Sequence, residues 1–188
     1  NNFSVFKLIE SWPNWPGKWV NIFGPKGSGK THLSNILKKK LDKVLMVEAV
    51  KVDNTTLSKF QKMNCLIIDN YKSNINEELF YTILNQSKQD DNYIVINSLL
   101  PIKNAYPSLK DLKSRIESFI NFGIELQTDD LLRVIITKYF SDKQIEISPK
   151  VSEYIIKNVE RSYEKVFKII KEIDELSLSS GKSININL

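Results

Sequence analysis

The feature that most constrains the fold is a glycine-rich run near one end of the chain. It reads, in order, Gly24, Pro25, Lys26, Gly27, Ser28, Gly29, Lys30 and Thr31. This run fits the phosphate-loop pattern G-x-x-x-x-G-K-[ST] at every fixed position. The apolar segment 19–23 precedes it, and segment 32–41, with leucine and isoleucine at helical spacing, follows it. Strand, glycine loop and helix in this order predict a nucleotide-binding site.

The residue types of this loop suit a polyphosphate. Its three glycines let backbone N–H groups turn toward phosphates, and the start of the following helix adds a positive end. We expect Lys30 to reach the β- and γ-phosphates and the Thr31 hydroxyl to ligate Mg²⁺, with ADP or ATP as the cofactor. We include His32 among the nucleotide-contacting residues, without a catalytic role. Adenine could stack on Trp12 or Trp15, although packing against the sheet is the simpler interpretation.

Further apolar segments predict the rest of a parallel sheet. The four expected strands cover residues 44–47, 65–68, 93–96 and 120–126. Polar segments with helical periodicity lie between them, and strands that alternate with helices indicate βαβ units. We therefore expect an α/β fold with a five-stranded parallel sheet flanked by helices.

The pattern changes after the last expected strand. Helices without strands are predicted to begin near Asp129, after Ser148, and near Arg161. This change divides the chain into a nucleotide-binding core, residues 1–127, and a small helical subdomain, residues 128–188.

Composition excludes several classes of protein. No apolar run approaches the roughly 20 residues of a membrane span, and Cys65 has no second cysteine to pair with. We expect a cytoplasmic protein without contact with a membrane. The net charge of +5 is compatible with DNA binding, but the positive charge is spread-out lysine. Its densest run, Lys38–Lys40, ends a predicted helix, where it is either solvated or a contact for DNA.

An acid follows the third expected strand. Asp69 ends the apolar run 65–68 and would hold the Mg²⁺ shell, as a Walker B acid does. The next residue is Asn70, and an amide cannot take a proton from an attacking water. We therefore expect weak or absent intrinsic ATP hydrolysis. Glu77 and Glu78 could substitute for the missing acid, or could simply favour the start of a helix.

A further polar pair and the three arginines complete the candidate residues. Asn97 and Ser98 end the fourth expected strand, where Asn97 could contact the γ-phosphate or the attacking water, or could form a turn. Arg115 ends a short predicted helix, where a ring-forming ATPase carries the arginine that enters a neighbour's nucleotide site; a surface salt bridge is the alternative. Arg161 begins the last predicted helix and could fold over the nucleotide. Arg133 suits a surface or packing role.

With these residues in place, the chain resembles the AAA+ domain of the DnaA family of replication initiators. Within this family it is similar to the short homologue Hda, especially its alphaproteobacterial form. The resemblance rests on residues 11–16, 31–33, 67–69, 111–115 and 160–162.

The resemblance implies a five-stranded AAA+ domain with a helical lid and a role in regulating replication initiation. Hda-type proteins, bound to ADP and to the DNA-loaded sliding clamp, stimulate hydrolysis of the ATP held by DnaA. By position, Arg115 is then the arginine finger offered in trans, Arg161 the sensor of the lid and Asn97 the first sensor. Lys30, Thr31 and Asp69 hold the chain's own nucleotide.

The implied partners are DnaA, the sliding clamp through an N-terminal peptide that is not visible here, and a second copy of the chain, with DNA contacted only indirectly. Two residues depart from the family: Asn70 replaces a second acid, and Leu99 stands where DnaA tends to have an aspartate. No helix-turn-helix segment follows the helices, which favours the short homologue. The alternatives are a DNA-associated AAA+ ATPase such as a helicase loader, a DnaA-like DNA-binding factor, and a nucleotide-gated scaffold.

Overall fold

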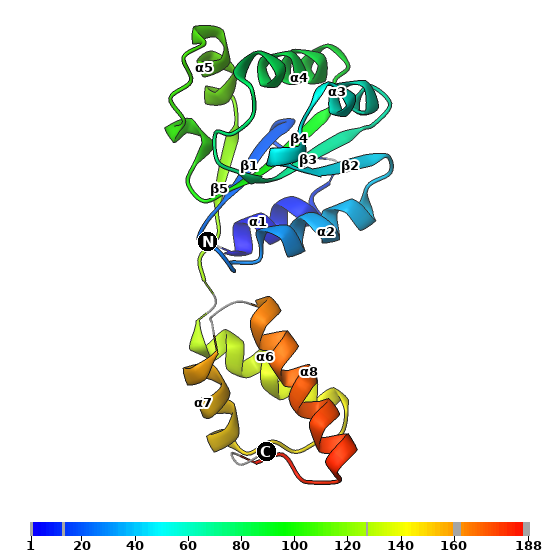
Figure 1. Cartoon of the computed structure of the whole chain (residues 1–188), viewed down its shortest axis with the longest axis vertical. Coiled ribbons are helices and arrows are strands. Elements are labelled where there is room, and N and C mark those ends of the chain that lie inside the picture. The colour runs from blue at the N-terminus through cyan, green and yellow to red at the C-terminus, as the bar shows by residue number, and fades with distance from the viewer. Residues whose placement is uncertain (1, 13, 127, 160–162, 186–188) are drawn as a thin grey trace. The chain divides into compact units, whose positions relative to one another are not determined.

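The computed structural model describes residues 2–12, 14–126, 128–159 and 163–185 (Figure 1). The chain forms two compact units. The first is an α/β unit that contains residues up to 25 and residues 30–125, and the second contains residues 26–29 and the helical residues from Leu126 onward. No helix among the described residues is both long enough and apolar enough to cross a membrane.

The α/β unit is built on one parallel sheet with the strand order β2-β3-β4-β1-β5. The strands are β1 (Trp19–Phe23), β2 (Val44–Glu48), β3 (Cys65–Tyr71), β4 (Tyr93–Ser98) and β5 (Ile120–Gly123). The predicted five-stranded parallel sheet is confirmed. The predicted last strand was too long: β5 pairs only with β1, and it ends where β1 ends, at the pair of Phe23 and Gly123.

Helices cover both faces of the sheet (Figure 1). They are α1 (Asn2–Glu10), α2 (Lys30–Lys40), α3 (Asn54–Phe60), α4 (Glu77–Gln89) and α5 (Lys110–Glu117), with short 3₁₀ turns at Ala49–Lys51 and Ile102–Asn104. Successive side chains of β3 point to opposite faces of the sheet. Leu66 and Ile68 pack with α3, α4 and α5, whereas Cys65 and Ile67 pack with α1 and α2. Burial on both faces explains why the strands are continuously apolar.

The helical unit contains α6 (Asp129–Asp142), α7 (Pro149–Asn158) and α8 (Tyr163–Ser180). Each of the first two begins at a hydroxyl N-cap: Thr128 accepts the N–H of Leu131, and Ser148 accepts that of Val151. Pro149 takes the first helical position, as the serine–proline pair predicts. The three helices enclose their own apolar core, which includes Leu132, Ile136, Phe140, Ile155 and Ile170.

Candidate nucleotide site

The glycine-rich loop joins β1 to α2 at the carboxyl edge of the sheet. Gly27 and Gly29 have φ of 82° and 98°, backbone conformations that residues with a Cβ rarely adopt. The Lys30 ammonium donates to the carbonyl oxygens of Gly24 and Pro25, both at 2.8 Å, and so lies across the loop. Burial lowers the pKa of Lys30, and the nearby Asp69 carboxylate partly opposes this shift. The position of the Lys30 side chain across the loop suits the binding of an anion.

Three predicted residues meet next to this loop. The Thr31 hydroxyl donates to Oδ2 of Asp69 at 2.8 Å, and the Asn97 amide donates to Oδ1 of Asp69 at 2.9 Å. The backbone N–H of Asn70 also donates to Oδ1, at 3.0 Å. The strand order produces this arrangement, because β4 lies between β1 and β3 and all three strands end at the same edge.

The Asn97 side chain is fully buried and belongs to this cluster. Its amide nitrogen donates to the Ser34 hydroxyl at 2.8 Å as well as to Asp69. Its oxygen has no hydrogen-bond partner among the residues that the structure describes. A buried acceptor without a donor is costly, so Oδ1 of Asn97 is a natural contact for a water molecule at this site.

The oxygen ligands at this edge fit Mg²⁺ bound together with phosphates. The Thr31 hydroxyl and the Asp69 carboxylate are hard donors within hydrogen-bond distance of each other. In the described part of the chain no three His, Cys, Asp or Glu side chains cluster closely enough to hold a metal ion alone. The remaining ligands would have to come from phosphate oxygens and water, as is usual for Mg²⁺.

Asn70 lies at an irregularity in β3. It has φ of 57°, and the pairing of β3 with β4 shifts register between Ile68 and Tyr71. Asparagine and aspartate both tolerate this left-handed conformation better than other residues, so an aspartate would fit here equally well. The Asn70 side chain is exposed at the carboxyl edge. The amide therefore lies close to the site but cannot act as a general base.

Glu77 is already engaged elsewhere. Its two carboxylate oxygens accept the backbone N–H groups of Ser108 at 2.9 Å and of Leu109 at 2.8 Å, just before α5. These bonds connect the starts of α4 and α5 and make Glu77 a poor substitute for a catalytic acid. Glu78 is exposed in the first turn of α4, which suits the helix-start interpretation.

Two polar residues that support the site were not recognised in the sequence. Ser34 follows Lys30 by one helical turn, so its hydroxyl faces the same side of α2 and reaches Asn97. Asn21 is fully buried within β1: its amide nitrogen donates to Ile96 O and to the Ser98 hydroxyl, and its oxygen accepts the N–H of Ile102. The signal available for Asn21 was a polar residue inside an otherwise apolar strand.

The two predicted tryptophans lie at the edge of the sheet opposite the phosphate loop. Trp12 and Trp15 pack on Tyr93, with ring centroids 4.3 and 5.6 Å apart, at the amino end of β4. These contacts support the interpretation that both tryptophans pack against the sheet. His32 is exposed in the first turn of α2, and Lys38–Lys40 are exposed in its last turn.

The three arginines have different environments. Arg115 lies in the last turn of α5 at the amino edge of the sheet, and its Nε donates to Oδ1 of Asn85 at 3.1 Å. Arg133 lies on α6 and pairs with Asp130 and Glu153; the hydrogen bonds that it donates to Glu153 are the main cause that raises the pKa of Arg133. This is the surface role that the sequence predicts. Arg161 lies outside the described residues.

The fold and the site together define the class. A five-stranded parallel sheet in this order, a phosphate loop after β1 and an acid near the end of β3 give the chain the fold of the AAA+ P-loop NTPases. Domain III of the Thermotoga maritima replication initiator DnaA superposes with a TM-score of 0.78 at 17% identity, over 98% of this chain and 86% of that one. The T. maritima branch-migration motor RuvB gives 0.73 at 20% identity, over 99% and 65%.

The sequence comparison is narrower: the chain is homologous to the chromosomal replication initiator DnaA. It is 27% identical to DnaA of Buchnera aphidicola subsp. Baizongia pistaciae over 218 aligned positions, and 28% identical to that of subsp. Cinara cedri over 219. These alignments cover 100% and 99% of this chain but 47% of each relative, so the chain spans about half their length. No protein-family model matches the chain. These relatives are DnaA proteins and do not single out the Hda group.

One solved structure of similar fold holds a nucleotide analogue. DnaA from Aquifex aeolicus bound to AMPPCP superposes with a TM-score of 0.70 at 20% identity, over 91% of this chain and 59% of that one. At this level of identity the likeness concerns the fold.

Proposed function

We propose that the chain is a nucleotide-binding AAA+ regulator of chromosomal replication initiation, which stimulates hydrolysis of DnaA-bound ATP in the manner of Hda. The observation that carries this proposal is the place of Arg115. It lies at the amino edge of the sheet, whereas the phosphate loop lies at the carboxyl edge. Its one hydrogen bond within the described residues uses Nε and a neutral amide, so the terminal guanidinium nitrogens are available to a partner's triphosphate.

The proposal includes a nucleotide of the chain's own. ADP or ATP would occupy the phosphate loop, with Lys30 on the phosphates and Mg²⁺ held by Thr31 and Asp69. The contact of Thr31 with Asp69 at 2.8 Å supports this, as does the analogue bound to the Aquifex DnaA. Asn97 would orient a water or the γ-phosphate, and Arg161 would act as the sensor that the family resemblance implies.

The chain would hydrolyse its own nucleotide slowly. Asn70 offers no base, and both oxygens of Glu77 accept backbone N–H groups. A chain that keeps its nucleotide and lends an arginine to a neighbour suits a regulator in the cytoplasm. Its further proposed partners are the sliding clamp and a second copy of the chain, with DNA contacted through the clamp.

A second candidate is a DnaA-like factor that binds DNA itself. The sequence relatives favour it, because both are DnaA proteins. DNA binding by the purified chain that falls steeply with salt would support this candidate over the first.

The deciding experiment mixes the chain with ATP-loaded DnaA, clamp and DNA, and follows conversion of the DnaA-bound ATP to ADP. We expect stimulation by the unmodified chain and its loss in Arg115→Ala, because an arginine finger contributes about 10³–10⁵ to the rate in other systems. Arg133→Ala is the matched control and should retain stimulation, since Arg133 already pairs with Asp130 and Glu153. Equal stimulation by Arg115→Ala and the unmodified chain would refute the finger assignment.

A further inference from the structure

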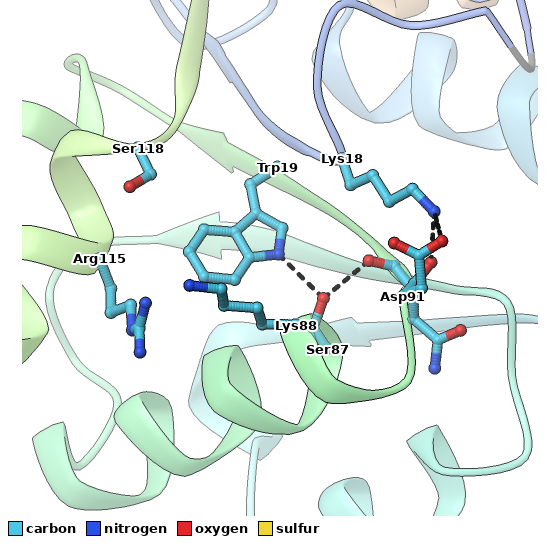
Figure 2. A pocket seen from close by; sticks show the side chains of 8 residues that line it. Lys18, Trp19, Ser87, Lys88, Asp91, Arg115 and Ser118 are labelled. Atoms are coloured by element: carbon cyan, nitrogen blue, oxygen red, sulfur yellow. Dashed lines mark hydrogen bonds and ion pairs between the residues drawn. The ribbon is translucent and has the colours of Figure 1, made fainter.

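A pocket of about 280 Å³ opens at the amino edge of the sheet, beside the first residue of β1 (Figure 2). Trp19 forms one wall and is held by a hydrogen bond from its indole N–H to the Ser87 hydroxyl at 2.9 Å. β1 begins here and ends at the phosphate loop, so roughly 15 Å of strand separates the pocket from the candidate nucleotide site. The pocket is therefore a distinct feature of the α/β unit.

The charges around the pocket do not balance. Lys18, Lys88 and Arg115 line it, together with one carboxylate, Asp91. Lys18 pairs with that carboxylate and also donates to the Asp91 carbonyl oxygen at 2.7 Å, so its charge is compensated. Within the described residues Lys88 has no ion pair, and Arg115 bonds only to the neutral amide of Asn85. Two cations in one pocket are thus left without a counter-charge.

The helices bring these two cations to the same place. Lys88 lies in the last turn of α4 and Arg115 in the last turn of α5. In Figure 2 the Lys88 side chain extends below the indole of Trp19 toward the side on which Arg115 lies. A cation in the last turn of a helix interacts favourably with the negative end of the helix dipole. This interaction does not explain why both cations line one pocket.

The size of the pocket limits its ligand. Sites for drug-sized molecules measure roughly 300–1,000 Å³, so 280 Å³ is small for a whole nucleotide but sufficient for one or two phosphoryl groups. Ser118 also lines the pocket, and its hydroxyl donates to the Ser114 carbonyl oxygen at 3.3 Å. A guanidinium and an ammonium are groups that bind phosphoryl oxygens, the guanidinium through paired hydrogen bonds and the ammonium as a point charge.

We propose that this pocket is a second anion site, which takes a phosphoryl oxyanion between Lys88 and Arg115. Free pyrophosphate and the terminal phosphates of a nucleotide share this chemistry. If the proposed function holds, the phosphoryl group comes from the triphosphate bound by the partner, and Lys88 contacts it beside Arg115. Only this identification of the phosphoryl group rests on the proposed function.

The test uses the full chain with Lys30→Ala, which disables the phosphate loop, and measures pyrophosphate binding by titration calorimetry. We expect one site, with affinity at least about tenfold weaker in Lys88→Gln because a hydrogen bond to a charged group is lost. Lys88→Arg, which keeps the charge, should bind within about threefold of the parent. Lys138→Gln on α6 removes the same charge from an exposed position outside the pocket and should bind as the parent does.

Absence of pyrophosphate binding at millimolar concentration, or equal affinity in Lys88→Gln and Lys138→Gln, would overturn the proposal. A parallel titration with ATP identifies the source. ATP binding that Lys88→Gln weakens supports a nucleotide, and binding of pyrophosphate alone supports a free phosphate. A different result would refute the proposed function and leave the anion site intact: the chain would not accelerate hydrolysis of DnaA-bound ATP, while pyrophosphate binding would persist.

Discussion

Asn70 shows how one residue can limit the chemistry of a complete binding site. The hydrogen-bonded chain from Thr31 through Asp69 to Asn97 is assembled, and Lys30 lies across the loop. The position after Asp69 nevertheless carries an amide, in a backbone conformation that would accept an aspartate. We therefore propose that this candidate site holds a nucleotide more readily than it hydrolyses one.

Asn70→Asp should therefore raise the steady-state ATP turnover of the chain, by at least about tenfold, since a positioned general base contributes 10²–10⁴ in other enzymes. Phosphate release from the purified protein measures this. Asn70→Gly is the control, because glycine keeps the left-handed conformation but adds no carboxylate, and its turnover should stay at the parent level. A parent chain that already turns over several ATP molecules per second would contradict the interpretation of Asn70.

At the scale of single elements, side-chain caps set where helices begin. Asn76 accepts the N–H of Leu79 at 3.0 Å at the start of α4, the helix whose Phe80, Ile83 and Leu84 fill the core. Helix α3 begins with Asp53, which accepts the N–H of Thr56 at 2.9 Å and the Thr55 hydroxyl at 2.7 Å. Each cap satisfies backbone groups that would otherwise lack a partner.

Asn76→Ala should lower the free energy of unfolding by about 1 kcal/mol, the usual effect of losing a helix N-cap. Urea denaturation followed by circular dichroism measures this change. Asn76→Asp is the matched variant and should retain the stability of the parent, because a carboxylate also accepts the Leu79 N–H and favours the positive end of the helix. Equal destabilisation by both substitutions would mean that Asn76 acts through another contact.

The stabilisation that the Asp53 cap gives to α3 depends on pH. Hydrogen bonds, first from the Thr55 hydroxyl and then from the Thr56 N–H, lower the pKa of Asp53 below its ordinary value of 3.8. Because the folded pKa is the lower one, the stabilisation is fully present above the unfolded pKa and is lost as pH falls through the folded pKa. A carbon NMR titration should show a midpoint below 3.8 for Asp53, moved upward in Thr55→Ala. An unchanged midpoint in this variant would exclude the Thr55 hydroxyl as the cause.

At the scale of the whole molecule, function depends on which groups face which edge of the sheet. The carboxyl edge carries the phosphate loop, Asp69 and Asn97, and the amino edge carries Arg115, Lys88 and the pocket. Cys65 begins β3 on the face that packs with α1 and α2, where burial raises the pKa of its thiol to about 12 and keeps it protonated and unreactive. Under the proposals above, the two edges would bind two different ligands.

A nucleotide bound at the carboxyl edge should stabilise the folded chain against heat. At a concentration of 100 times the dissociation constant, ligand linkage contributes about 2.7 kcal/mol, which moves the unfolding midpoint upward by several degrees. Differential scanning calorimetry with ADP and Mg²⁺ measures this shift, and Lys30→Ala should abolish it. The exposed Lys103→Ala, on the turn after β4, should keep it. A shift that survives in Lys30→Ala would locate the nucleotide elsewhere.

Local sequence was sufficient for the phosphate loop, the order of strands and helices and the parallel sheet, because glycine pattern, strand composition and helical spacing are properties of neighbouring residues. It was not sufficient for the supporting roles of Ser34 and Asn21, or for the engagement of Glu77 with the turn before α5, since each depends on a contact between distant segments. The pairing of β4 between β1 and β3 is what brings Asn97 to Asp69 and Ser34. Likewise, Lys88 and Arg115 line one pocket only because α4 and α5 pack side by side on the sheet. Their positions in the sequence do not predict that they lie at the same edge.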